Sequence, residues 1–199
     1  MGWAPLWNSP TKGLSSSALK GPVGKHIVDY AAQKGVGIIL WAGYNAFNAD
    51  IEGVCRHYAA MGVKGFKIDF MDRDDQPMMA FYYRAAEACA KHKLLVDFHG
   101  CAKPAGMNRT YPNVINFEAV FGLEQMKWSK TTVDHMAYDV TMPFIRMVAG
   151  PIDYTQGAMR NATKSNYRPV NREPMSQGTR CHQLAAYAVF YSPLSMLCD

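Results

Sequence analysis

The sequence lacks any Cys-x-x-Cys pair, and its cysteines are few and widely spaced. Their number is odd, at five, and they stand at Cys55, Cys89, Cys101, Cys181 and Cys198. Disulfide frameworks and structural zinc sites need paired or closely spaced cysteines, so neither is indicated. We therefore expect free, buried thiols.

Long apolar runs and clusters of one charge are also missing. No segment approaches the length needed to span a membrane, so we expect no membrane span. The net charge of +5 is spread over the chain without a basic run, which argues against a nucleic-acid partner. The opening MGWAPLWNSP has neither a basic start nor an apolar centre, so we expect no secretory signal within it.

The composition is that of a globular protein. The chain has 199 residues, of which 49% are hydrophobic and 19% are charged. A length of this order favours a single domain. No glycine-rich phosphate fingerprint follows an apolar run, so a dinucleotide-binding fold is poorly supported.

Short apolar runs alternate with segments of helical periodicity. After a loop over residues 6–24, helices are predicted over residues 25–35, 48–62, 77–93 and 178–191. Strands are predicted over residues 36–43, 63–70, 94–100, 114–120, 142–150 and 193–199. This rhythm predicts an α/β protein with a parallel sheet, covered by helices or closed into a barrel.

Helix boundaries carry their own chemical markers. Asn48 or Asp50 is a plausible N-cap of the second helix, and Gly62 its C-terminal stop. Pro77 stands at the start of the third helix. The acids just before it, Asp72, Asp74 and Asp75, are interpreted as caps and solvated charge.

Polar residues interrupt the apolar strands at their C-terminal ends. The pairs are Lys67 with Asp69, Asp97 with His99, and Asn116 with Glu118, followed by Glu124, Arg146 and Asp153. The members of each pair are two residues apart, so their side chains share a face of the sheet. In a (β/α)8 TIM barrel the active site is built at these strand ends, which favours a catalytic interpretation.

Other interpretations stay open for single residues. Asp69 could form a structural salt bridge with Lys67, and His99 could be a satisfied core histidine. Lys67 could also serve as a Schiff-base lysine, as in aldolase-type barrels. The aromatic residues Trp41, Tyr44, Trp128 and Tyr154 could stack on sugars in a non-enzymatic binding protein, or belong to the core.

Three segments together are distinctive. MGVKGFKIDFMDRDDQ, LLVDFHGCAKPAGMNRTYPNVINFEAVFGLE and PFIRMVAGPIDYTQGA resemble glycoside hydrolase family 97. The block over residues 109–124, which begins at Arg109, is the most specific. The resemblance implies hydrolysis of α-glycosidic bonds, chiefly α-galactosides and α-glucosides, with an oligosaccharide as substrate.

The resemblance also implies roles for individual residues. Asp69 matches the nucleophile of retaining members, which are mostly α-galactosidases, and Glu124 matches their acid/base. Inverting members carry a base glutamate directly after the histidine of the next strand, where this chain has Gly100. The retaining branch is therefore implied. Retention requires the two carboxyl groups to lie roughly 5–5.5 Å apart.

Further residues are expected around these two carboxyl groups. Lys67 would favour the ionised form of Asp69, and Glu118 would keep Glu124 protonated. A substrate-binding role is expected for Lys67, Asp97, His99, Trp41, Arg109 and Asp153. Glu118 also matches a calcium ligand of the family, so Ca²⁺ is an implied cofactor.

The match implies only part of a larger enzyme. A complete barrel needs about 250 residues, and this chain resembles roughly strands three to eight, with Gly2 and Trp3 at the end of the second. Residues 1–199 would then form a partial barrel without the family's N-terminal β-sandwich and C-terminal β domain. A periplasmic or secreted location is implied. The alternatives are a retaining enzyme for α-glucosides or β-L-arabinopyranosides, or an inactive truncated sugar-binding barrel.

Overall fold

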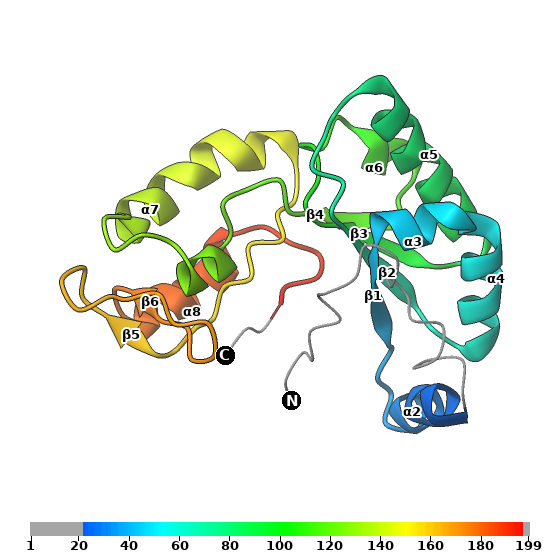
Figure 1. Cartoon of the computed structure of the whole chain (residues 1–199), viewed down its shortest axis with the longest axis horizontal. Helices are drawn as coiled ribbons and strands as arrows, with labels where there is room; N and C mark the ends of the chain where they lie inside the picture. The colour runs from blue at the N-terminus through cyan, green and yellow to red at the C-terminus, as the bar shows by residue number, and fades with distance from the viewer. Residues whose placement is uncertain (1–21, 197–199) are drawn as a thin grey trace. The chain divides into compact units, whose positions relative to one another are not determined.

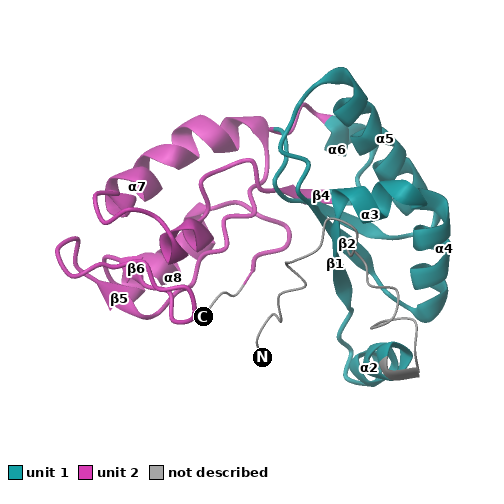
Figure 2. Cartoon of the chain, in the orientation of Figure 1, with its two compact units in different colours: residues 1–102, 107–114 teal, residues 103–106, 115–199 magenta. Residues whose placement is uncertain are grey.

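The computed structural model describes residues 22–196 and divides the chain into two compact units (Figures 1 and 2). Unit 1 comprises residues 1–102 and 107–114, and unit 2 comprises residues 103–106 and 115–199. The predicted loop before residue 22, the strand end at Gly2 and Trp3, and Cys198 lie outside the described residues. None of the described helices is long and apolar enough to cross a membrane.

Unit 1 is built from alternating strands and helices. Its elements in chain order are α2 (Pro22–Gln33), β1 (Ile39–Gly43), α3 (Tyr44–Ala49), α4 (Ile51–Met61), β2 (Gly65–Asp69), α5 (Gln76–Lys91), β3 (Leu95–Phe98) and α6 (Met107–Thr110). β1 pairs with β2, and β2 with β3, both in parallel. The prediction of an α/β protein with parallel strands is confirmed.

Local capping chemistry sets the helix boundaries in unit 1. Asp50 caps α4 by accepting a hydrogen bond from the Gly53 N–H, and Gly62 ends that helix in the left-handed region. Asp75 caps α5 by accepting from the Met78 N–H. The predicted stop at Gly62 and the capping role of Asp75 are therefore confirmed, and Asp50 is the N-cap.

The central strand β2 has two chemically different faces. Phe66 and Ile68 are fully buried, and the Phe66 ring packs edge-on against Phe47 of α3 and Tyr58 of α4. Figure 1 shows α3, α4 and α5 on this helical side of the strands. Because side chains alternate along a strand, Lys67 and Asp69 are directed to the opposite face. Because the apolar face must stay buried, the strand cannot shift by one residue, and the polar side chains stay on the other face.

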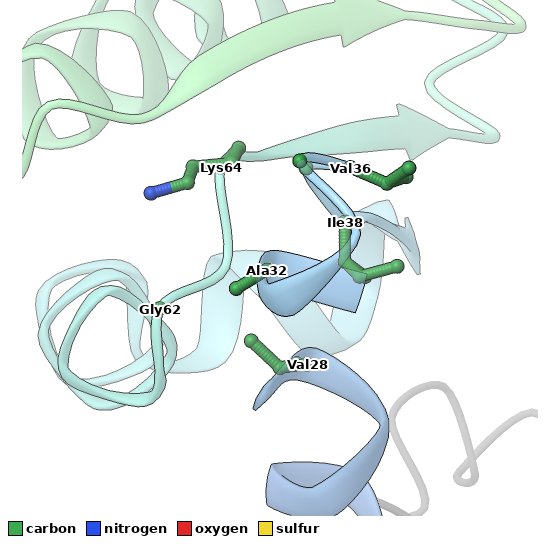
Figure 3. A pocket seen from close by; sticks show the side chains of 8 residues that line it. Val28, Ala32, Val36, Ile38, Gly62 and Lys64 are labelled. Atoms are coloured by element: carbon green, nitrogen blue, oxygen red, sulfur yellow. The ribbon is translucent and has the colours of Figure 1, made fainter. Parts of the chain in front are cut away.

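A surface cavity of about 270 Å³ lies at the other end of these strands (Figure 3). It is lined by Val28 and Ala32 of α2, by Ile38 before β1 and by Lys64 before β2. The N-terminal ends of barrel strands serve stability rather than catalysis. This cavity therefore lies at the opposite end of the strands from the predicted site.

Unit 2 contains most of β4 (Val114–Phe117) and the elements after it. These are η1 (Leu123–Lys127), α7 (His135–Arg146), η2 (Met147–Ala149), β5 (Asn161–Ala162), β6 (Ser176–Gln177) and α8 (Arg180–Val189). Its core includes Met126, Met142, Ile152, Tyr154 and Phe190. A buried carboxylate, Asp139, accepts a hydrogen bond from the Tyr154 hydroxyl and contacts His135 and His182 within this unit.

The predicted strand over residues 142–150 is wrong, because most of it belongs to α7 and η2. Asp134 caps the helix by accepting from the Ala137 N–H. Buried side chains then recur at His135, Asp139, Met142 and Arg146, which is helical spacing. Pro143 lies inside this helix.

The predicted strand over residues 193–199 is also wrong for its described part. Residues 193–196 have no strand conformation. The Asn116 side chain instead donates to Ser192 Oγ and to the Leu194 carbonyl. These hydrogen bonds from a side chain stand in place of the backbone hydrogen bonds that a strand would form. No disulfide joins Cys55, Cys89, Cys101 and Cys181, as predicted. Cys55 and Cys89 are buried as expected, whereas Cys101 is half-buried and Cys181 is exposed.

Candidate active site

The parallel register gathers polar side chains on one face of unit 1. Trp41 aligns with Lys67 across β1 and β2, and Lys67 aligns with Asp97 across β2 and β3. One strand position further on stands Asp69, and His99 follows the end of β3. Five residues predicted from separate segments of the sequence therefore meet at the C-terminal ends of three strands.

Asp69 is held by contacts with three neighbouring groups. It is 8% exposed. Its Oδ2 accepts a hydrogen bond from Trp41 Nε1 at 3.0 Å and lies 3.4 Å from His99 Nδ1. Its Oδ1 accepts from the Phe70 N–H at 2.6 Å. These groups hold the carboxylate in one orientation.

The same contacts favour the ionised form of Asp69. Burial is the largest single influence and opposes ionisation, but His99, Trp41 and the Phe70 N–H together outweigh it and lower the pKa of Asp69. The sequence also predicts that Lys67 favours the ionised form of Asp69. Lys67 Nζ lies 3.8 Å from Asp97 Oδ2.

The pairing of Lys67 also bears on the Schiff-base interpretation. A Schiff-base lysine must be a neutral amine to attack a carbonyl. An adjacent buried carboxylate favours the ammonium form instead. Asp97 is 1% exposed, so the lysine faces a charge that solvent does not screen. The geometry therefore favours a polar binding role for this pair over an amine nucleophile.

Gly100 leaves room for the Asp69 carboxylate. Its backbone is in the left-handed region at φ +52°. A Cβ added there would lie 2.8 Å from Asp69 Oδ1 and 3.0 Å from the Phe70 nitrogen. Real Cβ atoms do not approach so closely, so a side chain at position 100 and this orientation of Asp69 exclude one another.

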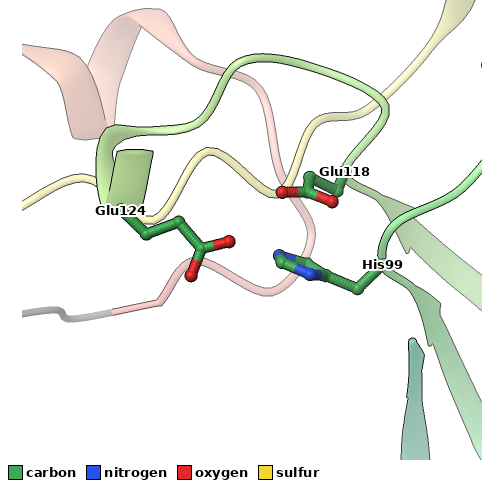
Figure 4. Close-up of side chains that lie close together, drawn as sticks. All are labelled: His99, Glu118 and Glu124. Atoms are coloured by element: carbon green, nitrogen blue, oxygen red, sulfur yellow. The ribbon is translucent and has the colours of Figure 1, made fainter. Parts of the chain in front are cut away.

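Unit 2 contains the second pair of predicted carboxyl groups. Glu118 directly follows β4, and Glu124 stands in the first turn of η1. One carboxylate oxygen from each lies within 4.8 Å of the other, and Figure 4 shows the two groups directed toward one another. The expected neighbourhood of Glu118 and Glu124 is therefore present.

The backbone of Glu124 is held from the segment after α7. The Leu123 N–H donates to the Tyr154 carbonyl at 2.9 Å, and the Glu124 N–H donates to Thr155 Oγ1 at 3.3 Å. Asp153 in the same segment is 1% exposed, and its N–H donates to the Phe117 carbonyl at 2.8 Å. Asp153 is therefore integrated into unit 2 beside the end of β4.

Four other predicted residues have contacts of a different kind. Arg109 is exposed on α6 and makes no hydrogen bond or ion pair with any residue in the described range. Tyr154 is 1% exposed and packs on Phe190 at 4.5 Å. Tyr44 packs on Phe81 at 4.7 Å. Both tyrosines belong to packed clusters, and Trp128 is exposed beside Gln125.

Thr155 was missed by the sequence, and Arg146 was predicted in the wrong kind of element. Thr155 had no assigned part, although its hydroxyl contacts the Glu124 backbone. Arg146 was placed at a strand end, but it lies on a helix and binds the backbone after β4. The spacing of polar residues could not reveal either contact, since both are made to backbone groups rather than to side chains.

The chain is similar to curated enzymes over most of its length. It is 73% identical over 175 residues to a retaining alpha-galactosidase of Bacteroides thetaiotaomicron, covering 88% of this chain and 26% of that protein. It is 37% identical over 142 residues to a probable retaining alpha-galactosidase of Streptomyces bingchenggensis, covering 70% and 21% respectively. The chain thus spans about a quarter of the length of these relatives.

Solved structures are similar as well. A beta-arabinopyranosidase crystal structure matches with a TM-score of 0.80 at 27% identity, over 94% of this chain and 32% of that one. A family 97 enzyme of Pseudoalteromonas sp. strain K8 in complex with panose matches with a TM-score of 0.73 at 25% identity, over 87% and 29%. The sequence profile described as Glycoside hydrolase 97 matches residues 1–120. The chain therefore belongs to glycoside hydrolase family 97.

Proposed function

We propose that this chain carries the catalytic carboxyl groups of a retaining glycosidase that cleaves terminal α-galactosides. One observation carries the proposal: Asp69 is held ionised at the C-terminal end of β2 by His99 and Trp41, with Gly100 leaving it space. The 73% identity to a retaining alpha-galactosidase supports the same assignment.

The proposed mechanism is double displacement. The Asp69 carboxylate attacks the anomeric carbon while Glu124 donates a proton to the departing glycosidic oxygen. Glu124, now ionised, then takes a proton from water as that water attacks the glycosyl–Asp69 ester. The aspartate is released, and the sugar keeps its original anomeric configuration. Lys67 and Asp97 offer a donor and an acceptor to sugar hydroxyls.

We infer that the parallel strands of unit 1 belong to a (β/α)8 barrel. The partial-barrel assignment, about strands three to eight, rests on the family and on polar residues at one end of parallel strands. Residues 142–150 and the described part of 193–199 supply no strand, so the assignment depends on β1 to β4. A crystal structure of the full-length family member tests it by showing whether these strands close into a barrel.

Replacing Gly100 with alanine should lower kcat/KM on an aryl α-galactoside by about 10²-fold, since misplacing a reacting group by about 1 Å has effects of this size. The reason is the 2.8 Å approach of the added Cβ to Asp69 Oδ1. Steady-state kinetics of purified variants measures the effect.

Gly35 provides a matched control. Its φ is +71°, but a Cβ added there meets nothing within 4 Å. Gly35→Ala therefore introduces the same kind of backbone strain without touching Asp69, and it should keep near wild-type kcat/KM. Equal losses in both variants would show that strain, rather than displacement of Asp69, explains the result.

We propose further that Glu118 binds calcium. The Glu118 carboxylate is an oxygen donor of the kind that Ca²⁺ prefers, and it directly follows β4, with an oxygen of Glu124 within 4.8 Å of it. Gly100 contributes no carboxylate, so other oxygen atoms must complete the coordination of the calcium ion. Bound calcium would supply positive charge near the reacting sugar.

Chelation should lower both activity and stability. A ligand that binds only the folded state at about 100 times its Kd adds roughly 2.7 kcal/mol to the free energy of unfolding. We therefore expect Ca²⁺ to raise the Tm of the EDTA-treated chain, and Glu118→Gln to abolish that rise. An unchanged Tm of the wild-type chain on adding Ca²⁺ would rule this site out.

Sugar specificity is tested by parallel assays on aryl α-galactoside, α-glucoside and β-L-arabinopyranoside. The proposal predicts the highest kcat/KM on the α-galactoside. The similarity to a beta-arabinopyranosidase makes the third substrate the relevant competitor. A higher kcat/KM on that substrate would replace the α-galactosidase assignment, and no turnover of any of the three would leave a non-catalytic sugar-binding chain.

A further inference from the structure

A buried arginine binds the backbone where Glu118 leaves β4. Arg146 of α7 is 4% exposed. Its Nε donates to the Ala119 carbonyl at 3.0 Å, and Nη2 donates to the carbonyls of Phe117 at 3.3 Å and Glu118 at 3.2 Å. Three consecutive carbonyl groups are therefore fixed by one guanidinium.

The same guanidinium also binds the chain that follows α7. Nη1 donates to the Gly150 carbonyl at 3.3 Å, and Nη2 donates to the Pro151 carbonyl at 3.1 Å. These residues lead within a few positions to Thr155, which accepts from the Glu124 N–H. Arg146 thus ties both chain segments that support the two glutamates to one helix.

The backbone at this point is not in a relaxed conformation. Ala119 has φ +38° and Thr155 has φ +59°, both in the region that favours glycine. Non-glycine residues stay in such conformations only when the surrounding structure holds them. Arg146 contacts the Ala119 carbonyl directly, so it is one of the groups that hold this turn in place.

We propose that Arg146 is a positioning residue for the acid/base Glu124 and its neighbour Glu118. It acts through the backbone of the loop that carries both carboxyl groups and does not touch the substrate. The planar guanidinium suits this role because its five N–H donors are fixed in one fork. A lysine keeps the charge but cannot bind several carbonyls with the same geometry. The inference rests on the proposed function.

Leaving-group dependence distinguishes positioning from general damage. Nitrophenol departs without much help from an acid, whereas the sugar hydroxyl of a disaccharide needs a proton as it leaves. A misplaced Glu124 therefore slows disaccharide cleavage far more than aryl glycoside cleavage. A chain that is only partly folded loses both activities in the same proportion.

The test compares wild-type and Arg146→Lys forms of the 199-residue chain on 4-nitrophenyl α-galactoside and an α-galactosyl disaccharide. We expect kcat/KM on the disaccharide to fall by about 10²-fold and on the aryl substrate by less than about threefold, with kcat and KM for the aryl substrate falling together as the glycosyl–enzyme accumulates. Arg180→Lys is the matched control, because Arg180 also donates to a backbone carbonyl in unit 2, that of Met159. It should leave both activities near wild type.

A second pair of variants covers the case in which Arg146→Lys does not fold. Thr155→Val removes the oxygen that accepts from the Glu124 N–H, and Thr155→Ser keeps it. The valine form should show the same selective loss, and the serine form should not. Equal losses on both substrates, or none, overturn the positioning role. A wild-type chain that cleaves neither substrate overturns the proposed function, and the positioning role with it.

Discussion

Replacing Asp69 with asparagine should lower kcat/KM on an aryl α-galactoside by at least about 10⁴-fold, as removal of a nucleophile does in other covalent enzymes. The amide oxygen is a poor nucleophile, yet it can still accept the hydrogen bond from Trp41 Nε1. The fold around position 69 is therefore expected to persist. Steady-state kinetics and circular dichroism of the purified variant check both statements.

Asp97→Asn is the control for this experiment. Asp97 is more deeply buried than Asp69 and pairs with Lys67, but the mechanism gives it no bond to the anomeric carbon. It should raise KM more than it lowers kcat. If Asp69→Asn retained a tenth of wild-type kcat/KM, Asp69 could not be the nucleophile.

The environment of Asp69 also predicts the acid side of the pH profile. The reaction needs the ionised carboxylate, and His99 and Trp41 lower its pKa despite burial. Activity that depends on Asp69 should therefore persist below the ordinary aspartate pKa of about 3.9. Its contribution to stability is present above that unfolded-state value and is lost as the pH falls through the lower folded-state pKa.

Glu124→Gln should lower kcat/KM on an α-galactosyl disaccharide by about 10²–10⁴-fold, the usual contribution of a general acid. On 4-nitrophenyl α-galactoside the first step should be nearly unaffected, because the leaving group needs little protonation. The second step loses its base, so the glycosyl–enzyme should accumulate. Pre-steady-state kinetics should then show a burst of nitrophenol followed by slow turnover.

Glu87→Gln serves as the control for that variant. Glu87 is an exposed glutamate on α5, and losing its charge should change neither step. A Glu124→Gln chain that cleaved the disaccharide as fast as wild type would remove Glu124 from the acid/base role. The leaving-group comparison would then point to another proton donor.

The local parts of the fold could be predicted because they depend on neighbouring residues. The left-handed stop at Gly62 and the cap at Asp75 are fixed by groups within four positions of each other. The error over residues 142–150 has the same basis. The element begins with a cap at Asp134, upstream of the apolar run that was interpreted, and Pro143 is tolerated inside the helix.

The gathering of polar groups was also predictable, but their pairing was not. Alternation along a strand and a parallel register place Lys67, Asp69 and Asp97 on one face whatever the loops do. Which side chains form hydrogen bonds depends on their conformations, and the spacing of residues in the sequence does not determine those. The hydrogen bond from Trp41 to Asp69 could not be read from the sequence, and neither could the bonds from Arg146 to backbone carbonyl groups.

The most direct test of the account is the anomeric configuration of the first sugar released, followed by ¹H NMR during hydrolysis of an aryl α-galactoside. Double displacement through Asp69 predicts that α-galactose forms first and the β-anomer appears only later by mutarotation. β-Galactose as the first product would mean a single displacement by water, and it would contradict the role assigned to Asp69.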